Sequence, residues 1–309
     1  MEVFDEASYP ADAPAVAVSV GVYDGVHLCH RHVLSQLRRL AQERGLPTLV
    51  VTFDPHPASV VDKDRAPLLL CTLERRLQLL EDLGINRCLV VGFDPDRAQQ
   101  SAEGFVDRVL VGMLHAAVVV VGENFRFGHD RAGDVDLLRS LSFDGGFEVE
   151  PVALDALDGE PETSSRIRAA VGAGDVDGAN VLLGRPHEIE GVVVRGAGRG
   201  RTIGFPTANL EVSRRRGVPD VGSYAGTWTR PGGERHVAAI SIGRRPTFLV
   251  DGDVLIEAHL CDFSDDLYGE PGRIGFVSRL RAEARFESVD ALVQQIALDV
   301  EATRAAVGR

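Results

Sequence analysis

Two histidines stand three residues apart after a glycine-containing turn near the N-terminus, in the segment GVYDGVHLCH. Gly21 and Gly25 allow the backbone to approach a ligand closely. His27 and His30 would lie at the start of the following helix, where backbone N–H groups favour an anion. The segment therefore indicates a receptor for a phosphate chain, although two histidines at this spacing are more often ordinary helix-surface residues.

A second segment, RGAGRGRTIGFPTANL at residues 195–210, also points to phosphate chemistry. Its glycines would let backbone N–H groups wrap phosphate oxygens. Thr207 and Asn209 offer neutral oxygens to a hard cation that also binds ATP, and Mg²⁺ is the expected ion. The chain has no GxxxxGK[ST] segment and Lys63 is its only lysine, so this site must work without a P-loop lysine. Taken alone, a loop of this composition is more often a flexible hairpin.

The first site would sit on a domain of alternating strands and helices. Between residues 15 and 152, apolar runs such as VAVSV and AAVVVV alternate with helical stretches such as HRHVLSQLRRLAQERG. Strands this uniformly apolar belong in a parallel sheet covered on both faces, so the pattern predicts a doubly wound α/β domain. Asn124, Phe125, Arg126 and Phe127 follow the fourth predicted strand, at the sheet edge where ligands gather. For one of the two phenylalanines we favour core packing.

The second site would belong to a mainly β domain. After the helical stretch SSRIRAAVGAGD, the chain shows short strands separated by Gly, Pro and Asn turns. Five strands are predicted: EIEGVVVRG, GSYAGTWTR, RHVAAISIG, DVLIEAHLCDF and GRIGFVSRLRAEARF. This number suits a small closed barrel. The tail SVDALVQQIALDVEATRAAV has helical periodicity and should pack against that barrel.

Length and composition narrow the class of protein. A chain of 309 residues exceeds what one hydrophobic core usually supports, so two domains are expected. No apolar run approaches the roughly 18 residues that a membrane span needs. The acidic residues 1–14 predict a flexible lead-in rather than a secretory signal. The four cysteines lie far apart, which argues against disulfides and a zinc site. These observations together predict a cytoplasmic protein.

Charge bears on the choice of partners. The formal net charge of −13 repels a polyanion, so we expect no nucleic-acid partner. The triplet Arg214–Arg216 is the one local basic run, and we interpret it as a solvated loop. We also expect no membrane partner, and the sequence leaves a homo-oligomer open.

Several motifs together resemble one enzyme family. GVYDGVHLCHR resembles the H-x-G-H signature of nucleotidyltransferases and the first motif of bacterial bifunctional riboflavin kinase/FAD synthetases. TFDPHP, TLERR, GENFRFGHDRAGD and SSRIR follow in the family's order. The resemblance implies a Rossmann-like nucleotidyltransferase domain followed by a flavokinase barrel with a C-terminal helix. We accordingly predict a flexible segment 1–14, an FMN adenylyltransferase domain at 15–180 and a riboflavin kinase domain at 181–309.

The resemblance implies roles in the first domain. His27 and His30 would bind the ATP phosphates and stabilise charge at the α-phosphorus while the FMN phosphate attacks. Arg168, also assigned a catalytic role, would clamp the β- and γ-phosphates together with Arg166, and Ser164 would donate a hydroxyl. Without the matching motifs, an N-capped helix with exposed arginines is the simpler interpretation. The residues implied to bind nucleotide or flavin here are Gly21, Tyr23, Asp24, Gly25, Asn124, Arg126, Ser164 and Arg166.

Three further residues of this domain leave alternatives open. Asp54 and His56 could reach a metal or the flavin phosphate, or their Pro-rich loop could be rigid for structural reasons. Cys29 stands where the family pattern has glycine. A glycine there suggests close approach of the backbone to phosphate or an unusual conformation, so the substitution could impair the first domain or alter its nucleotide preference.

In the second domain the resemblance is to the flavokinase motif GRGRxxGFPTAN and to a downstream strand, IEAHLCDFSDDLYG. It implies that Glu257 is the catalytic base for the ribityl hydroxyl, with Thr207 and Asn209 as metal ligands. For His259 and Asp262, which we expect on the same strand, we favour a role as cross-strand hydrogen-bonding partners. GVPDVGSYAG would be a flap near the flavin, and RRPTF, ending at Phe248, also matches. The implied nucleotide-binding residues are Gly198, Arg201, Gly204 and Pro206.

The predicted function is ATP-dependent phosphorylation of riboflavin to FMN by the second domain and adenylylation of FMN to FAD by the first, with pyrophosphate released. Riboflavin, FMN and ATP are the expected small molecules, and Mg²⁺ the expected cofactor. One alternative, prompted by Cys29, keeps only the kinase or uses another nucleotide or a flavin analogue. A flavin-binding sensor without turnover is a second alternative, against which Glu257, Thr207 and Asn209 argue.

Overall fold

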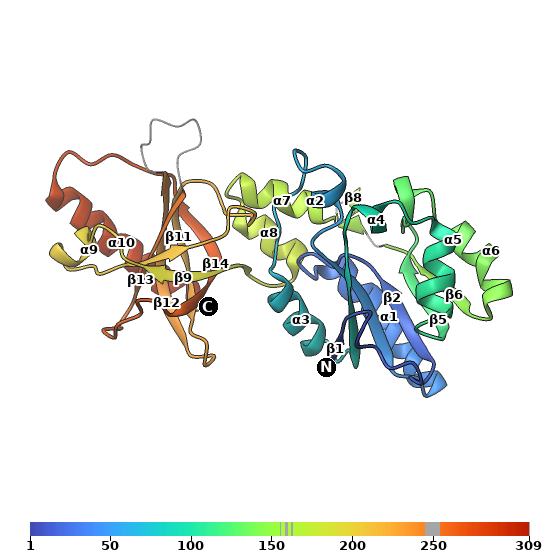
Figure 1. Ribbon diagram of the computed structural model, residues 1–309. Helices are drawn as coiled ribbons and strands as arrows, with labels where there is room; N and C mark the ends of the chain where they lie inside the picture. Colours follow the sequence, from blue (N-terminus) through green and yellow to red (C-terminus); the bar gives the residue numbers. More distant parts are fainter. Residues whose placement is uncertain (155, 158–159, 162, 245–253, 309) are drawn as a thin grey trace. The chain divides into compact units, whose positions relative to one another are not determined.

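The computed structural model describes residues 1–154, 156–157, 160–161, 163–244 and 254–308. The chain divides into two compact units, drawn together in Figure 1 and described here separately. Unit 1 comprises Met1–Pro67 and Thr72–Thr163, and unit 2 comprises Leu68–Cys71 and Ser164–Arg309. The predicted functional boundary lies at residue 180, whereas the contacts place helices α7 (Ser164–Gly172) and α8 (Val176–Leu183) with unit 2. The reason is that α8 packs on barrel strands, a contact that helical periodicity does not reveal.

Unit 1 is a parallel six-stranded sheet, which confirms the doubly wound prediction. Its strand order is β1-β4-β3-β2-β5-β6. The strands are β1 (Glu2–Phe4), β2 (Val16–Val20), β3 (Thr48–Asp54), β4 (Arg87–Gly92), β5 (Ala116–Gly122) and β6 (Glu148–Val152). From β2 the chain first builds outward through β3 and β4, and then returns to β5 on the other side. The strand order therefore reverses between β2 and β5, a position at which open sheets bind ligands.

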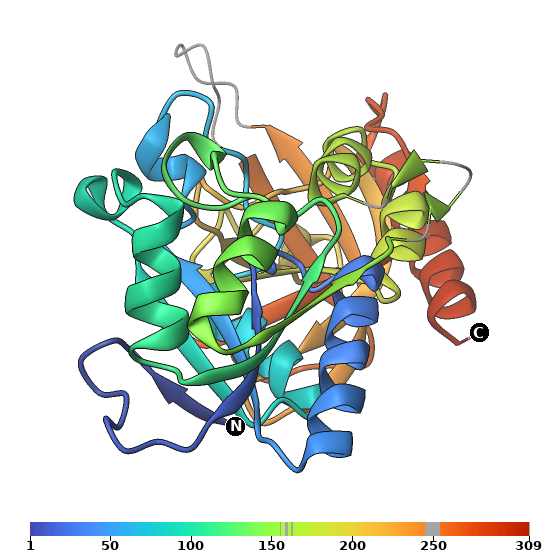
Figure 2. The ribbon, with the colours of Figure 1, turned by 90° about the vertical axis from the view of Figure 1, so that its right-hand side faces the viewer.

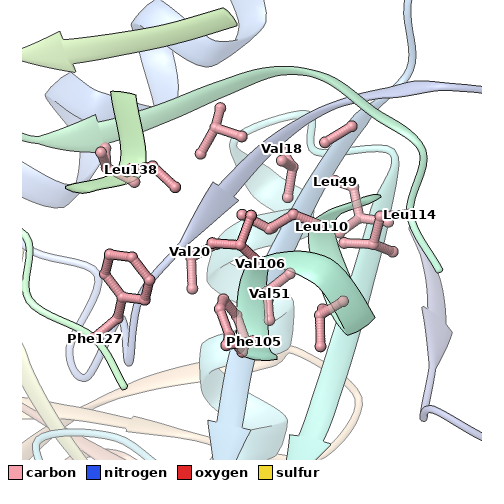
Figure 3. Packing of buried hydrophobic residues seen from close by; sticks show 14 of the residues in the cluster. Val18, Val20, Leu49, Val51, Phe105, Val106, Leu110, Leu114, Phe127 and Leu138 are labelled. Carbon is pink, nitrogen blue, oxygen red and sulfur yellow. The ribbon is translucent and has the colours of Figure 1, made fainter. Parts of the chain in front are cut away.

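Helices cover both faces of this sheet (Figure 2). Helices α1 (Leu28–Arg44) and α3 (Leu73–Asp82) pack on one face, and the other is covered by α5 (Ala102–Phe105), the π-helix η1 (Val106–Val111) and α6 (Val135–Gly145). Successive strand residues alternate between the two cores: Leu49 and Val51 join the cluster of Figure 3, whereas Val50 faces α1. The remaining short elements are α2 (Ala58–Val61), α4 (Pro95–Ala98), η2 (His129–Arg131), β7 (Ala156–Leu157) and β8 (Glu160–Pro161).

The first fourteen residues differ from the prediction of a flexible lead-in, which is wrong for residues 2–4. These form β1, paired in parallel with β4 through Glu2 and Arg87. Arg87 Nε also donates to Glu2 Oε2 over 3.1 Å, and the N-terminal amine contacts Glu81 Oε1 at 2.5 Å. A strand of three residues is too short to show a hydrophobic period, so its pairing could not be expected from the sequence.

Unit 2 is a closed antiparallel barrel, as predicted, with strand order β10-β13-β12-β11-β14-β9. Its elements are β9 (His187–Val194), α9 (Arg199–Thr202), β10 (Ala208–Glu211), β11 (Gly222–Thr229), β12 (Arg235–Arg244), β13 (Val254–Leu260), β14 (Pro271–Arg281) and α10 (Val289–Val307). Tyr224, Trp228 and Phe276 are fully buried in its core. Helix α10 contacts β11, β12 and β14, so the tail packs against the barrel as expected.

Two details of unit 2 differ from the sequence interpretation. Six strands close the barrel rather than five, because β10 lies inside the PTANLE segment, where the ligand motif concealed a short strand. The predicted strand GSYAGTWTR is present as β11, and the role of GVPDVGSYAG as a flap near the flavin stays a prediction. Arg216 is 4% exposed and hydrogen-bonds Glu190 at 3.1 Å, so only Arg214 and Arg215 of the triplet are solvated.

Candidate active sites

The predicted phosphate turn, residues 21–27, joins the end of β2 to the start of α1. The loop that follows β5 carries Asn124 and Arg126, and both side chains are exposed. The two loops leave the carboxyl ends of adjacent strands at the point where the strand order reverses. The fold thus brings two separately predicted groups to one ligand-binding edge.

The turn has an unusual backbone. Tyr23, Gly25 and Val26 have φ values of 53°, 83° and 42°. Left-handed φ is easy for glycine and rare for a β-branched valine, and such conformations persist where the surrounding structure enforces them. At Gly21, a Cβ atom would approach the Tyr23 ring to 2.9 Å. The two predicted glycines therefore have distinct roles: Gly25 allows a left-handed backbone conformation, and Gly21 allows close packing against the Tyr23 ring.

Tyr23 lies beneath the turn rather than at its surface. Its side chain is 3% exposed, and its hydroxyl lies 2.6 Å from Ser19 Oγ, which donates to Val120 O over 2.5 Å. Burial raises the pKa of the Tyr23 phenol. The Tyr23 side chain therefore supports the turn from below. A ligand bound at the turn would contact the backbone of the turn and not the Tyr23 ring.

His27 and His30 are brought together at the start of α1. His27 occupies the N-cap position, and its ring stacks on that of His30 with a centroid distance of 3.6 Å. The Tyr23 ring meets His30 edge-on at 5.0 Å. His27 is 3% exposed and the neighbouring Asp24 1%, so the interpretation of His27 as an ordinary surface residue is wrong. The arrangement places two imidazoles where helix N–H groups already favour negative charge.

Cys29 occupies the second position of α1, within regular helix. It is not among the residues with positive φ, and its side chain is 7% exposed. Helical backbone is open to every residue except proline, so the conformational reason for a glycine does not apply at this position.

The loop after β5 is held by an ion pair. Arg126 Nη1 lies 2.7 Å from Asp134 Oδ2, and Asp134 caps α6 by accepting from Leu137 N over 3.0 Å. The pKa of Asp134 is lowered, first by the Leu137 N–H and also by Arg126. Phe127 is 8% exposed and joins the core, while Phe125 stacks on it at 5.2 Å. The expectation of core packing for one phenylalanine is confirmed.

The other predicted residues of the first site fall in two places. Asp54 ends β3 and is exposed, and His56 Nδ1 accepts from Ala58 N over 3.1 Å at the start of α2. Ser164, Arg166 and Arg168 lie on α7, which belongs to unit 2. Within that unit Arg168 Nε donates to Leu68 O over 2.7 Å. Their nucleotide-binding role therefore stays a prediction.

The second site converges in the barrel. Asn209 on β10 pairs with Glu257 on β13, and Thr207 Oγ1 donates to Glu257 Oε1 over 3.2 Å. A Cβ atom at Gly196 would lie 2.4 Å from the Asn209 side chain, so the glycine-rich loop packs directly on that amide. The expected base and both expected metal ligands thus lie together. Such oxygen donors suit Mg²⁺.

The glycine-rich loop has the conformation that its composition predicts. Gly198 and Gly204 have φ values of 69° and 89°, and Arg201, on the short helix α9 between them, is exposed. His259 Nδ1 donates to Pro206 O over 2.8 Å, which fixes the end of this loop. Asp262 instead receives two hydrogen bonds from Arg304, at 2.7 and 2.9 Å, which lower its pKa. Both hydrogen bonds are structural, but neither joins two strands as we expected, because Pro206 precedes β10, Asp262 follows β13 and Arg304 lies on α10.

A cavity of about 800 Å³ adjoins these groups. Its lining includes the glycine-rich loop with Thr207, Asn209 and Glu257. It also includes the apolar side chains of Phe286, Leu292 and Ile296, the last two from α10. A cavity whose lining combines polar and apolar groups fits a planar aromatic molecule that carries a hydroxylated chain.

Asp299 is a lining residue that sequence reasoning missed. It is 8% exposed and accepts hydrogen bonds from Arg281 Nη2 at 2.7 Å and Gln295 Nε2 at 2.8 Å. The one available signal was an acidic side chain in the otherwise apolar stripe of the tail helix. The predicted RRPTF segment lies outside the described residues from position 245 onward.

Two features, a membrane-spanning helix and a cluster of metal-binding side chains, are missing from the described part of the chain. None of the described helices is long and apolar enough to cross a bilayer. In the described part of the chain, no three His, Cys, Asp or Glu side chains are grouped so as to hold a metal ion. The oxygen donors of Thr207 and Asn209 are outside that class of site.

Comparison with known proteins matches both units. Residues 9–166 match the FAD synthetase family model, and residues 183–307 match the riboflavin kinase model. A bifunctional riboflavin kinase/FMN adenylyltransferase of Pseudomonas fluorescens is 40% identical over 93% of this chain and 91% of its own length. The protein of that name from Listeria monocytogenes is 37% identical over 93% and 91%.

A structural relative is similar over almost the whole chain. It comes from Streptococcus pneumoniae, is described as a macrolide-efflux protein and is 30% identical. The TM-score is 0.87, and the match covers 98% of this chain and 99% of the relative.

Proposed function

The chain belongs to the family of bifunctional riboflavin kinases/FMN adenylyltransferases, and on that basis we propose how its residues divide the two reactions. The enzyme phosphorylates riboflavin with ATP to give FMN, and it adenylylates FMN with a second ATP to give FAD and pyrophosphate. The FAD synthetase match lies in the N-terminal part and the riboflavin kinase match in the C-terminal part. We assign these activities to residues 15–180 and 181–309, respectively.

In the adenylyltransferase, the turn at residues 21–27 holds the ATP phosphates. Backbone N–H groups at the start of α1 face them, and His27 and His30 stabilise the charge that develops as an FMN phosphate oxygen attacks the α-phosphorus. Pyrophosphate leaves, and no covalent enzyme intermediate is needed. Asn124 and Arg126 contact the flavin nucleotide, while Ser164, Arg166 and Arg168 bind the departing phosphates. The stacking of the two imidazoles at the helix N-terminus is the observation that carries this assignment.

In the kinase, riboflavin occupies the cavity of unit 2 with its ring against the apolar side chains of Phe286, Leu292 and Ile296. The terminal ribityl hydroxyl then lies at Glu257, which accepts its proton as the oxygen attacks the γ-phosphorus of ATP. Backbone groups of the loop from Gly196 to Gly204 hold the phosphates. The assignment rests on the contact between Thr207 and Glu257, which both line the cavity.

Thr207 and Asn209 would hold Mg²⁺ in this site. Their oxygens are the hard donors that Mg²⁺ prefers, and the Gly196 backbone packs so closely on Asn209 that a Cβ atom at position 196 would force the Asn209 amide to move. When bound, the ion neutralises charge on the phosphates of ATP. We further propose that the protein acts in the cytoplasm, without a nucleic-acid partner, and that a homo-oligomer is compatible with both reactions.

The test is a chromatographic time course with the full chain, riboflavin, ATP and Mg²⁺, repeated from FMN. His27→Ala should stop the progress of the reaction at FMN, and Glu257→Gln should prevent FMN formation while FMN supplied directly still becomes FAD. If each substitution slows both steps equally, or neither step, the residue assignments are wrong.

A further inference from the structure

We propose that Arg76, acting through Thr52, positions the phosphate-binding turn at residues 21–27. The inference rests on the adenylyltransferase site proposed above. Arg76 ends the TLERR segment and lies on α3, whose first turn is capped by Thr72. Its side chain is 1% exposed, so it does not meet ATP directly in the described structure.

Two consecutive hydrogen bonds connect Arg76 to the turn. Arg76 Nη1 donates to Thr52 Oγ1 and to Phe53 O, each over 3.0 Å. Thr52 Oγ1, having accepted that bond, donates its own proton to Val22 O over 2.9 Å. The guanidinium thus fixes the orientation of the hydroxyl, and the hydroxyl fixes the peptide that leads into Tyr23.

The turn needs such support because its backbone is strained. Left-handed φ at Tyr23 and Val26 is unfavourable for residues with a side chain, and it persists only when the surroundings hold it. Gly21 N also donates to Val51 O over 3.0 Å. Two successive residues of β3, Val51 and Thr52, therefore hydrogen-bond the turn. Without the Thr52 contact, the N–H groups that face the phosphates would lose their fixed direction.

The charge of Arg76 supports the same role. A buried guanidinium is normally paired with a carboxylate, but the hydrogen bonds described for Arg76 all go to neutral oxygens, and Nε has no partner among the described residues. The nearby Cys88 thiol does not serve as a counter-ion, since burial raises its pKa to about 12. A positive charge left uncompensated at the end of β3 favours negative charge at the adjoining turn.

The test compares threonines at the two ends of one strand. Thr52→Val removes the hydroxyl that contacts Val22, and Thr52→Ser retains it. Thr48→Val is the matched control, because Thr48 begins β3, is 4% exposed, and its hydroxyl hydrogen-bonds Asn86 and no other described residue. For each full-length variant, KM for ATP and kcat are measured in FMN adenylylation, with riboflavin phosphorylation measured in the same preparation.

We expect Thr52→Val to raise KM for ATP about tenfold, which corresponds to about 1.4 kcal/mol, the usual scale of one hydrogen bond. Thr52→Ser should restore KM to within about twofold, Thr48→Val should leave it unchanged, and riboflavin phosphorylation should be constant throughout. Equal KM values in the Thr52→Val and Thr48→Val variants would overturn the proposal. Arg76→Met should raise KM as Thr52→Val does; if that variant folds poorly, the threonine series decides. The His27→Ala result separately tests the site itself.

Discussion

Thr207 Oγ1 donates a hydrogen bond to Glu257 Oε1 over 3.2 Å, which joins the end of the glycine-rich loop to strand β13 of the barrel. Asn209 pairs with the same glutamate in the backbone register. In the kinase site that we propose, a metal ligand and a general base must both face the point where the substrate hydroxyl meets the γ-phosphate. The contact between Thr207 and Glu257 is consistent with that proposal.

Glu257→Gln should lower kcat for riboflavin phosphorylation by about a hundredfold to ten-thousandfold, because the amide cannot accept the hydroxyl proton. Steady-state kinetics with riboflavin and ATP measure this loss. FMN adenylylation by the same protein should stay within about twofold of wild type, since Glu257 lines the cavity of the barrel and is not among the residues assigned to the adenylyltransferase site. A variant that keeps more than half of its kinase activity would remove Glu257 from the role of base.

Asn209→Ala should raise the Mg²⁺ concentration needed for half-maximal kinase activity by about tenfold, the effect of losing one oxygen ligand or its support. The measurement is a Mg²⁺ titration at saturating riboflavin. Asn180→Ala provides the control, because Asn180 also donates from its amide within unit 2, to Phe276 O at 2.9 Å, and does not line the cavity. An equal shift in both variants would show that the effect is one of general stability.

Asp299→Asn should raise KM for riboflavin and lower the stability of unit 2 by about 1–3 kcal/mol, because the charged hydrogen bonds from Arg281 hold α10 over the cavity. Thermal unfolding and kinase kinetics check the two effects. Asp262→Asn weakens the exposed contact between Asp262, which follows β13, and Arg304 of the same helix, and it should change neither quantity appreciably. An unchanged KM in the Asp299 variant would mean that α10 does not depend on this contact.

Cys29→Gly should lower stability by about 1 kcal/mol, because glycine is unfavourable inside a helix, and it should leave the rate of FMN adenylylation within about threefold of wild type. Denaturant unfolding and initial rates with FMN and ATP measure both. A rate increase of tenfold or more would instead show that the cysteine side chain restrains the phosphate site.

The sequence predicted the layered fold because its apolar runs differ so clearly between the two halves. Uniform valine strands indicated a covered parallel sheet, and short strands between glycine turns indicated a barrel. The sequence did not predict strands β1 and β10, which contain three and four residues and offer too few positions to show a hydrophobic period. Only partners distant in the chain, such as Arg87 for Glu2, reveal such strands.

The candidate sites were predictable as motifs but not as contacts. The spacing of His27 and His30 indicated a phosphate receptor, yet it could not reveal that the two rings stack or that Tyr23 lies buried beneath them. The hydrogen bonds of Arg76 and Asp299 join residues 24 and 18 positions apart. Contacts of this kind are set by tertiary packing, for which local patterns carry no signal.

Trp228, the single tryptophan of the chain, lies fully buried in the barrel, and its indole N–H has no described hydrogen-bond partner. Intrinsic tryptophan fluorescence of this protein therefore originates from unit 2 alone. An emission shift to longer wavelength on heating follows the opening of the barrel, whereas circular dichroism averages over both units. The difference between the two melting curves gives a label-free measure of whether the two halves of the chain unfold as one cooperative body.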